Sequence, residues 1–210
     1  MEAKKLLMIV NPTAGRNKPR GPLFDAAAAF SQAGYLLTIH NTTSSSDAAE
    51  TAAASGEYHA VVAVGGDGTL NQVVSGLMTL EDRPLLGYIP QGSTNDFAAS
   101  LRLPTDPAEA AAQIMRDPPR KLDIGRWNDR HFVYVASSGA FARSSYAAPQ
   151  AAKNALGHFA YILEGMKDLN SLRPYQVKIT ADGETLDGEY LFGAVCNSPS
   201  IGGLMKLNPE

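Results

Sequence analysis

The 210-residue chain carries a formal net charge of -3, with 44% hydrophobic and 19% charged residues. This balance is typical of a folded globular protein and argues against a general nucleic-acid binder, whose surface would be strongly basic. The single cysteine, Cys196, cannot form an internal disulfide, which fits a reducing compartment.

The chain is long enough for one large domain or two small ones. The apolar run Leu6–Val10 is too short for the core of a secretory signal. No stretch approaches the roughly 18 apolar residues that a membrane-spanning helix needs. We therefore expect a cytoplasmic protein whose contact with a membrane, if it makes one, is peripheral.

Hydrophobic periodicity in the N-terminal part predicts alternating strands and helices. Short apolar runs predict strands at 6–10, 36–39, 61–64 and 85–89. Helices are predicted at 23–33, 47–54, 70–80, 97–101 and 107–115, with Ser46 or Asp47 as the N-cap of the second. This order predicts an α/β fold, namely a doubly wound parallel sheet with helices on both faces.

Polar loops follow the four predicted strands at their carboxyl ends. They occupy residues 11–15, 42–46, 65–69 and 91–96, and all are rich in Gly, Asn, Ser, Thr or Asp. Doubly wound sheets bind ligands at this edge, outside the carboxyl ends of the strands. We expect the four loops to converge on one polar site.

The pattern changes after Asp117-Pro118-Pro119. Residues 121–126 and 131–136 alternate around Asn128-Asp129 and predict a hairpin. A helix is predicted at 147–169, and β structure at 175–180 and 190–196, linked by a turn at Asp182-Gly183. We therefore expect a nucleotide-binding domain at 1–120 and a β-rich, sandwich-like domain at 121–210. Because 201–210 has loop character, we expect this second domain to be incomplete and the chain to be a fragment.

The loop Gly65-Gly66-Asp67-Gly68-Thr69 follows the buried strand directly. Glycines lack the Cβ atoms that keep another molecule away from the backbone, and a helix N-terminus favours an anion. The simplest ligand is a phosphate, although glycines at a strand end also serve tight turns. Asp67 would repel a bare phosphate, so it holds a cation, accepts a hydrogen bond from a hydroxyl, or caps the helix.

Several common site motifs are absent from the sequence. There is no Gly-Lys pair for a Walker A loop, and residue 71 is Asn where a dinucleotide fingerprint needs its last Gly. No G-x-S-x-G elbow is present. The four histidines are far apart and lack metal-ligand spacing.

The motifs GGDGTLN at 65–71 and PQGSTNDFA at 90–98 resemble the two signatures of the diacylglycerol kinase catalytic-domain family, which includes bacterial lipid kinases and sphingosine kinases. NPTAG at 11–15 and KLDIG at 121–125 resemble two further family segments, and the likeness runs from residue 4 to 210. GGDGT alone is shared with NAD kinases and phosphofructokinases. Two positions depart from the family pattern: Gln72, where Glu is common, and Ser93, where Thr is usual.

The resemblance implies an enzyme that transfers the γ-phosphoryl group of ATP to a lipid hydroxyl. It implies nucleotide contacts at Asn11, Pro12, Thr13, Ala14, Gly15, Thr42, Gly65, Gly66, Asp67, Gly68, Thr69, Leu70, Asn71, Ser93 and Asn95. Asp67, Asp96 and Asp123 are the carboxylates of the motifs, and we expect them to hold Mg²⁺ directly or through waters, with Asp67 catalytic. The alternative for Asp96 is a helix N-cap, and for Asp123 a structural ion pair.

The resemblance also implies that the general base and an acidic metal loop lie downstream of residue 210. If the polypeptide ends there, we expect little or no kinase activity. The alternatives are then a nucleotide-binding remnant without catalysis, or a soluble-substrate kinase of the NAD-kinase type. The acceptor lipid remains open among diacylglycerol, a sphingoid base, undecaprenol and phosphatidylglycerol.

We expect the lipid acceptor at a membrane surface and no nucleic-acid partner. The sequence leaves the oligomeric state open, with a homodimer as one candidate. Candidate residues for an apolar lipid slot are Phe132, Tyr134, Phe141, Phe159, Tyr161 and Ile162, for which ordinary core packing is the alternative role. Candidate contacts to acidic headgroups are Arg143, Lys153 and Lys167, for which a solvated surface is the alternative.

Overall fold

The computed structural model describes residues 3–15, 21–139, 174–197, 200–201 and 205–206. Two compact units are present, one of Met1–Tyr134 with Asn197–Glu210 and the other of Val135–Cys196. The helix predicted at 147–169 lies outside the described residues. So do the candidate lipid-site residues Phe141, Arg143, Lys153, Phe159, Tyr161, Ile162 and Lys167.

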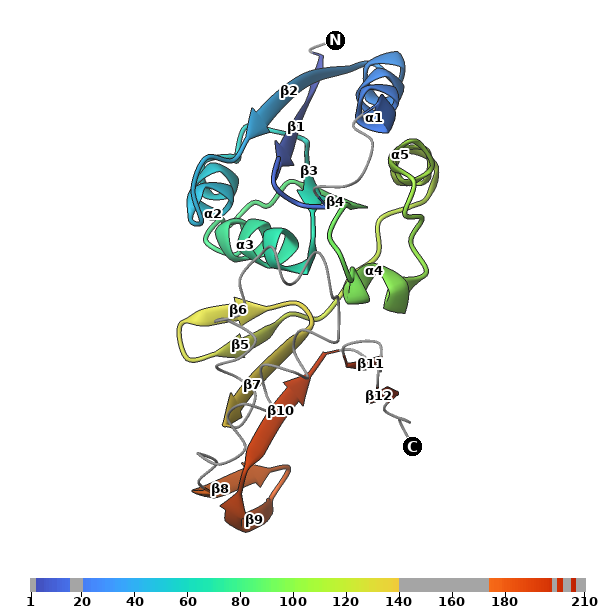
Figure 1. Ribbon diagram of the computed structural model, residues 1–210. Coiled ribbons are helices and arrows are strands. Elements are labelled where there is room, and N and C mark those ends of the chain that lie inside the picture. The colour runs from blue at the N-terminus through green and yellow to red at the C-terminus, as the bar shows by residue number, and fades with distance from the viewer. Residues whose placement is uncertain (1–2, 16–20, 140–173, 198–199, 202–204, 207–210) are drawn as a thin grey trace. The chain divides into compact units, whose positions relative to one another are not determined.

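A four-stranded parallel sheet forms the centre of the first unit (Figure 1). Its strands are β1 (Lys4–Val10), β2 (Tyr35–Asn41), β3 (Ala60–Gly65) and β4 (Leu85–Pro90), in the order β2-β1-β3-β4. The register aligns Val10 with both Asn41 and Val64, and Gly65 with Pro90. The predicted α/β class, with parallel strands joined by helices, is confirmed.

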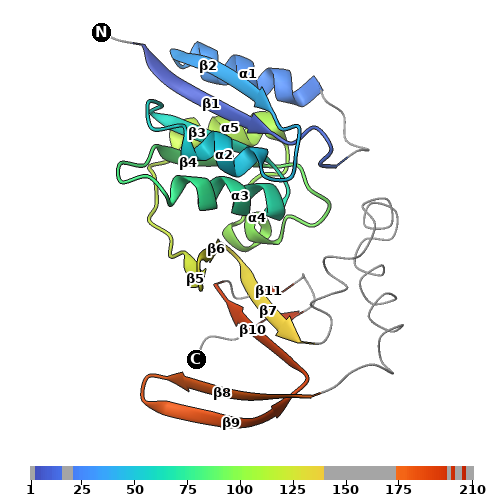
Figure 2. The ribbon, with the colours of Figure 1, turned by 90° about the vertical axis from the view of Figure 1, so that its left-hand side faces the viewer.

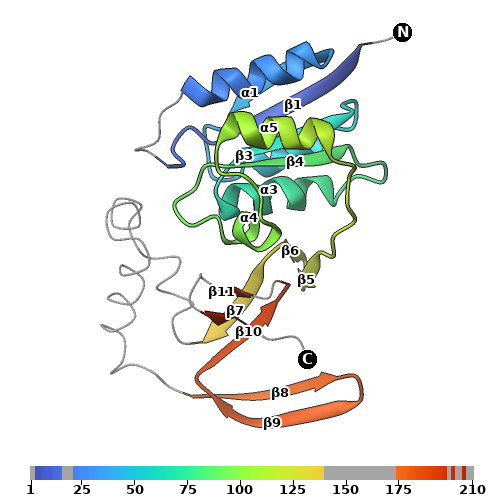
Figure 3. The ribbon, with the colours of Figure 1, turned by 90° about the vertical axis from the view of Figure 1, so that its right-hand side faces the viewer.

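Helices cover both faces of this sheet. They are α1 (Gly21–Gln32), α2 (Asp47–Ala53), α3 (Asp67–Leu77), α4 (Asp96–Leu101) and α5 (Pro107–Arg116). Helices α2 and α3 lie together in front of the sheet in Figure 2, and α1 and α5 lie together in front of the opposite face in Figure 3.

The inner strands β1 and β3 carry long buried apolar runs because both of their faces pack against helices. In β3, Val61 and Ala63 join the core under α2 and α3, whereas Val62 and Val64 join the core under α1 and α5. All four side chains are at most 1% exposed. A central parallel strand covered on both faces needs a continuous apolar run, which is the pattern that predicted it.

Helices α2 and α3 approach closely at Gly76. A Cβ atom built on Gly76 would lie 2.2 Å from the Ala49 carbonyl oxygen and 2.8 Å from the Ala52 Cβ. The small residues of α2 and the missing side chain at Gly76 therefore permit this spacing. The packing positions the N-terminus of α3 beside the loop that precedes α2.

A short hairpin follows α5 and packs with the first unit. It consists of β5 (Gly125–Trp127) and β6 (Arg130–Phe132), with Asn128 at a φ of 53° in the turn. The hairpin was predicted, but its second strand was wrongly extended to 136. The ladder stops because the Val133 N–H donates to the Asn71 side chain instead. The domain boundary predicted at residue 120 stays a prediction.

Two candidate lipid-site residues have core positions in this part of the chain. Phe132 is 9% exposed and covers Gly125, where an added Cβ would lie 2.2 Å from its ring. Tyr134 packs against the core under α2 and α3. Both residues therefore pack in the core, which the sequence offered as the alternative to lining a lipid slot.

The second unit contains only antiparallel pairs among its described residues. Strand β7 (Val135–Gly139) pairs with β10 (Phe192–Cys196), and β8 (Tyr175–Ala181) pairs with β9 (Glu184–Tyr190). The turn at Asp182-Gly183 was predicted correctly, and its φ values of 51° and 87° suit a two-residue hairpin turn. The strand predicted at 190–196 is present as β10, but it pairs with β7. The turn at Asp182-Gly183 instead links β8 to β9, a strand that was not predicted. In the first unit, two short strands, β11 (Ser200–Ile201) and β12 (Met205–Lys206), form an antiparallel pair near the end of the chain.

The close contact at Gly76 generates a stability prediction. Gly76→Ala should lower the free energy of unfolding by about 1–3 kcal/mol, because the added methyl overlaps α2 backbone atoms and outweighs the gain in helix propensity. Gly68→Ala, in the same helix but with no atom near the added Cβ, should leave stability unchanged or raise it by up to about 1 kcal/mol. Urea unfolding of both variants measures this, and equal stabilities would contradict the predicted crowding.

Candidate functional site

The order β2-β1-β3-β4 creates a switch point between β1 and β3. The chain leaves β1 toward α1 on one face, and it leaves β3 toward α3 on the other. The loops after these strands therefore diverge and leave a crevice at the carboxyl edge, where doubly wound sheets bind ligands. The predicted loops 11–15 and 65–69 are the two that flank it.

One side-chain hydrogen bond joins the two loops across this crevice. The Asn11 Nδ2 donates to the Thr69 Oγ1 at 3.0 Å. The Asn11 Oδ1 accepts from the Thr13 N–H at 3.0 Å and from the Thr13 hydroxyl at 2.8 Å. The amide of Asn11 therefore holds both its own loop and the first turn of α3.

A hollow of about 400 Å³ opens beside this hydrogen bond. Its lining comes from the loops after β1 and β2 and from the start of α3, and consists of Asn11, Thr13, Thr42, Thr43, Ser44, Ser45, Ala48, Thr69 and Gln72. The structure thus brings the predicted residues Asn11, Thr13, Thr42 and Thr69 together. Among the described residues, the lining has many hydroxyl groups and no charged side chain.

Thr43, Ser44 and Ser45 lie in the predicted polar loop 42–46, but of that loop sequence reasoning named only Thr42 as a nucleotide contact. Their signal was present, because a run of small hydroxyl residues directly follows a strand of the sheet. The loop is held at its start by the Thr42 N–H, which donates to the Val10 carbonyl oxygen at 2.9 Å. Gln72, identified as a departure from the family pattern, also lines the hollow.

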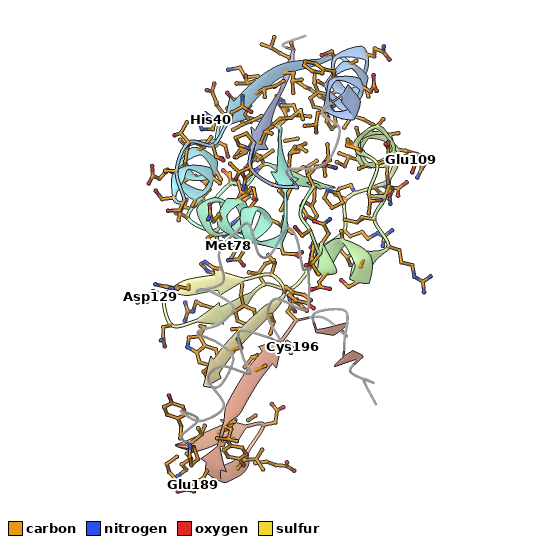
Figure 4. All side chains as sticks on the ribbon, viewed as in Figure 1. His40, Met78, Glu109, Asp129, Glu189 and Cys196 are labelled. Atoms are coloured by element: carbon orange, nitrogen blue, oxygen red, sulfur yellow. The ribbon has the colours of Figure 1, made fainter. Side chains whose placement is uncertain are left out.

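Asp47 holds the same loop from the first residue of α2. Its carboxylate accepts from the Thr43 N–H at 2.7 Å and lies 2.8 Å from the His40 Nε2. The hydroxyls of Thr43 and Thr51 donate to it at 3.0 and 3.1 Å. The Thr43 backbone bond, followed by the His40 bond, lowers the pKa of Asp47 to about 2. His40, labelled in Figure 4, comes from β2 at the edge of the sheet.

The loop after β3 and the loop after β4 meet through two glycines, Gly66 and Gly92. A Cβ added to Gly66 would lie 3.1 Å from the Gly92 Cα, and one added to Gly92 would lie 2.5 Å from the Gly66 Cα. The backbones of the two signature motifs therefore touch, and Gly66 and Gly92 are needed for that packing. Gly68 alone of the three loop glycines has open space at its Cβ position and is exposed.

Asp67 caps the helix that follows the second motif. Its two carboxylate oxygens accept from the N–H groups of Asp96 and Phe97, each at 3.1 Å. Of the roles predicted for Asp67, the structure shows a helix cap, but for α4 instead of its own helix. Asp96, for which a capping role was the alternative, is the first residue of α4 and follows the N-cap Asn95.

Asn95 fixes the shape of its own loop. It is 6% exposed and has a φ of 55°, in the left-handed region that Asn tolerates better than most residues. Its Oδ1 accepts from the Gly92 N–H at 2.8 Å, and its Nδ2 donates to the Gly92 carbonyl at 3.0 Å. Both polar atoms of this side chain are therefore engaged within the loop.

Tyr88 supports the motif loops from β4. Its hydroxyl donates to the Gly65 carbonyl oxygen at 3.2 Å, and its ring lies 6.5 Å from that of Phe97 between centroids. Burial, with a smaller contribution from the negative charge of Asp67, raises the pKa of Tyr88 far above its ordinary value. Tyr88 therefore acts as a neutral hydrogen-bond donor at this position.

Asn71 and Leu70 have structural contacts. The Asn71 Nδ2 donates to the His131 carbonyl at 3.2 Å, and its Oδ1 accepts from the Val133 N–H at 3.1 Å. Leu70 is 1% exposed in the core under α2 and α3. Ser93 is exposed on the loop before α4. Nucleotide contacts by these residues and by Asn95 stay predictions.

The three predicted metal ligands do not form one cluster. Asp67 lies beside the start of α4, whereas Asp123 is exposed and its backbone carbonyl accepts from Asn197 at 2.6 Å. Within the described ranges, no group of three or more His, Cys, Asp or Glu side chains is placed to hold a metal ion. These carboxylates therefore do not fit a shared three-ligand site in this structure, and their metal role stays a prediction.

Comparison with known proteins agrees with this geometry. Residues 5–127 match the diacylglycerol kinase catalytic domain family. A diacylglycerol kinase of Bacillus subtilis is 41% identical over 210 residues, covering 99% of this chain and 69% of the relative. One of Staphylococcus saprophyticus is 35% identical over 209 residues, covering 99% of this chain and 68% of the relative. The chain belongs to the diacylglycerol kinase catalytic domain family.

A solved structure of a diacylglycerol kinase from Bacillus anthracis is 30% identical, with a TM-score of 0.74, and the match covers 97% of this chain and 67% of that one. The resemblance inferred from residues 65–71 and 90–98 is therefore confirmed. Family membership identifies a phosphotransferase of the lipid-kinase type. Among the described residues, no helix has the length and apolar character needed to cross a membrane.

The position of Asp67 predicts a local effect on α4. Asp67→Ala should expose the Asp96 and Phe97 amides and lower the free energy of unfolding by about 1–2 kcal/mol, as loss of a helix cap does. Native-state hydrogen exchange should show faster exchange at those two amides than in the wild type. Asp82→Ala, at an exposed position between α3 and β4, is the matched control. Unchanged protection of α4 in Asp67→Ala would contradict the capping role.

The lowered pKa of Asp47 predicts a stability change at acid pH. A carboxyl whose pKa falls from 3.8 to about 2 on folding stabilises the folded state above pH 4, and this contribution is lost as the pH falls from about 4 to 2. The difference in unfolding free energy between wild type and Asp47→Asn should therefore shrink over that range. Urea unfolding at several pH values measures it, and a constant difference would contradict the assignment.

Proposed function

We propose that this member of the family binds ATP in the hydroxyl-lined hollow and transfers its γ-phosphoryl group to a lipid hydroxyl. The observation that carries the proposal is the Asn11–Thr69 hydrogen bond, which joins the loops on the two sides of the switch point beside that hollow. The family match supports phosphoryl transfer. The location of the hollow at the carboxyl edge of the sheet, beside the switch point, supports nucleotide binding.

The described groups that line the hollow, and that we propose as nucleotide contacts, are uncharged. Thr13, Thr42 and Thr43 offer hydroxyls to sugar or phosphate oxygens, and such groups can both donate and accept hydrogen bonds. Helix α3 has 11 residues and no side-chain cap at its N-terminus, and Gly68 in its first turn is exposed. The positive end of the helix dipole there favours a phosphate.

Phosphoryl transfer depends on positioning more than on covalent chemistry of the protein. The Gly66–Gly92 contact, the Asp67 cap and the Asn95 bonds hold the two motif loops in one arrangement. A divalent cation, which the family implies, would neutralise charge on the phosphates. We propose Asp67, Asp96 and Asp123 as separate candidates for contact with that cation, not as one shared three-ligand site, and this proposal rests on the motifs alone.

We propose the lipid acceptor from the names of the relatives. Those from Bacillus subtilis and Staphylococcus saprophyticus are named diacylglycerol kinases, so diacylglycerol is the first lipid to test. We propose that the chain meets this lipid at a membrane surface through peripheral contact. Its oligomeric state is a separate question that size measurement in solution answers.

The nucleotide assignment is tested by binding to the 210-residue chain. Isothermal titration with ATP and MgCl₂ should give binding, and Thr69→Val should weaken it by about 5- to 20-fold, because the Asn11 amide loses its partner in the first turn of α3. Thr38→Val, on exposed edge strand β2, should bind like the wild type. Equal affinity of Thr69→Val and wild type would contradict the proposed position of the nucleotide.

The acceptor class is tested by phosphate transfer. Radiolabelled ATP is incubated with mixed micelles of diacylglycerol or a sphingoid base, and separately with NAD. Label transferred to diacylglycerol supports the proposal. Label transferred to NAD but to neither lipid supports the soluble-substrate alternative instead.

A further inference from the structure

The Asp47 carboxylate joins three segments of the first unit. His40 comes from β2, Thr43 from the loop after it, and Thr51 from the second turn of α2. Both oxygens are used: Oδ1 meets His40 and Thr51, and Oδ2 meets the backbone and hydroxyl of Thr43. A carboxylate with this many partners is fixed in one orientation.

The Asp47 carboxylate points in an unusual direction for a side chain in the first turn of a helix. The N-cap of α2, Ser46, makes no side-chain capping bond. Asp47 turns back along the chain and binds the N–H of Thr43, four residues before it. The carboxylate therefore holds the preceding loop in place, in addition to any favourable interaction with the helix dipole.

That loop forms one wall of the hollow. Thr42, Thr43, Ser44 and Ser45 all line it, whereas Asp47, His40 and Thr51 do not. The loop is held at its beginning by the Thr42 N–H on the Val10 carbonyl and at its middle by Asp47 on Thr43. Beyond these two anchored residues, the side chains of Ser44 and Ser45 are exposed. Asp47 is thus the group outside the hollow that fixes the hydroxyl wall.

We propose that Asp47 is a positioning residue for the nucleotide, acting through Thr43 on the wall formed by residues 42–45. This inference rests on the proposed function, because it assumes that the hollow is the nucleotide site. A loop that is already ordered loses less conformational freedom on binding, so the preformed wall raises affinity without a direct contact from Asp47.

The first test compares Asp47→Asn with a second helix-start carboxylate. An Asn side chain has a single acceptor oxygen, so it cannot reproduce all four contacts. Asp106 is the matched control, because its carboxylate accepts from the Ala108 and Glu109 N–H groups at 2.9 and 3.0 Å but does not line the hollow. ATP affinity is measured by isothermal titration, and unfolding by urea.

We expect Asp47→Asn to weaken ATP binding by about 5- to 20-fold, whereas Asp106→Asn weakens it by less than twofold although it also loses stability. In turnover assays with diacylglycerol, Asp47→Asn should raise the KM for ATP by a similar factor, with kcat and the KM for lipid within about twofold of wild type. If Asp47→Asn only destabilised the fold, the KM for ATP, the KM for lipid and kcat would change together, or only the folded fraction would fall. Equal ATP affinity of wild type and Asp47→Asn overturns the proposal.

Thr51→Val is a second variant that keeps the test decisive if Asp47→Asn does not fold. It removes one hydroxyl bond to Asp47 with nearly unchanged shape, and Thr51 does not line the hollow. We expect two- to fivefold weaker ATP binding, and an unchanged affinity would overturn the proposal. Failure of the wild type itself to bind ATP would contradict the proposed function, and that outcome is distinct from a variant that binds as tightly as wild type.

Discussion

The contact between the Gly66 and Gly92 backbones is the constraint on which the site depends. It brings together two loops from neighbouring strands of the sheet, at a distance that leaves no room for a Cβ atom at Gly92 and only a crowded position for one at Gly66. Once the loops touch, Asp67 reaches the start of α4 and Asn95 closes its own loop. The glycines of the first motif thus serve internal packing at Gly66 and leave backbone open to a ligand at Gly68.

A second, independent set of contacts builds the hollow on the other side of α3. Asn11 and Thr69 join the loops across the switch point, and Asp47 holds the hydroxyl loop after β2. No charged side chain of the described part of the chain lines this hollow, although Asp47 stands behind its wall. A carboxylate turned toward the protein backbone can order the wall without presenting its charge to a phosphate, which it would repel.

Much of the fold could be predicted from the sequence, and the errors have physical reasons. The strand at 61–64 was found because it is apolar on both faces, as a covered parallel strand must be. Strand β9 was missed because its sequence, ETLDGEY, has mostly polar residues and becomes a strand by pairing with β8. The hairpin strand was extended too far because alternation continues past Phe132, whereas Asn71 takes the Val133 N–H out of the ladder.

Of the four loops expected to converge on one site, those at 11–15, 42–46 and 65–69 line the hollow, whereas no described residue of 91–96 does. For the site, the sequence by itself determined which edge of the sheet carries the polar loops, because the carboxyl ends of parallel strands lie at one edge. It also determined the family, through the two motifs at 65–71 and 90–98. Only the tertiary structure decided which atoms pair there. The Asn11–Thr69 and Asp67–Asp96 bonds join residues 58 and 29 positions apart, so they depend on the packing of whole elements. Local pattern carries no information about such pairs, because each side chain has several partners of equal chemistry until the helices are packed on the sheet.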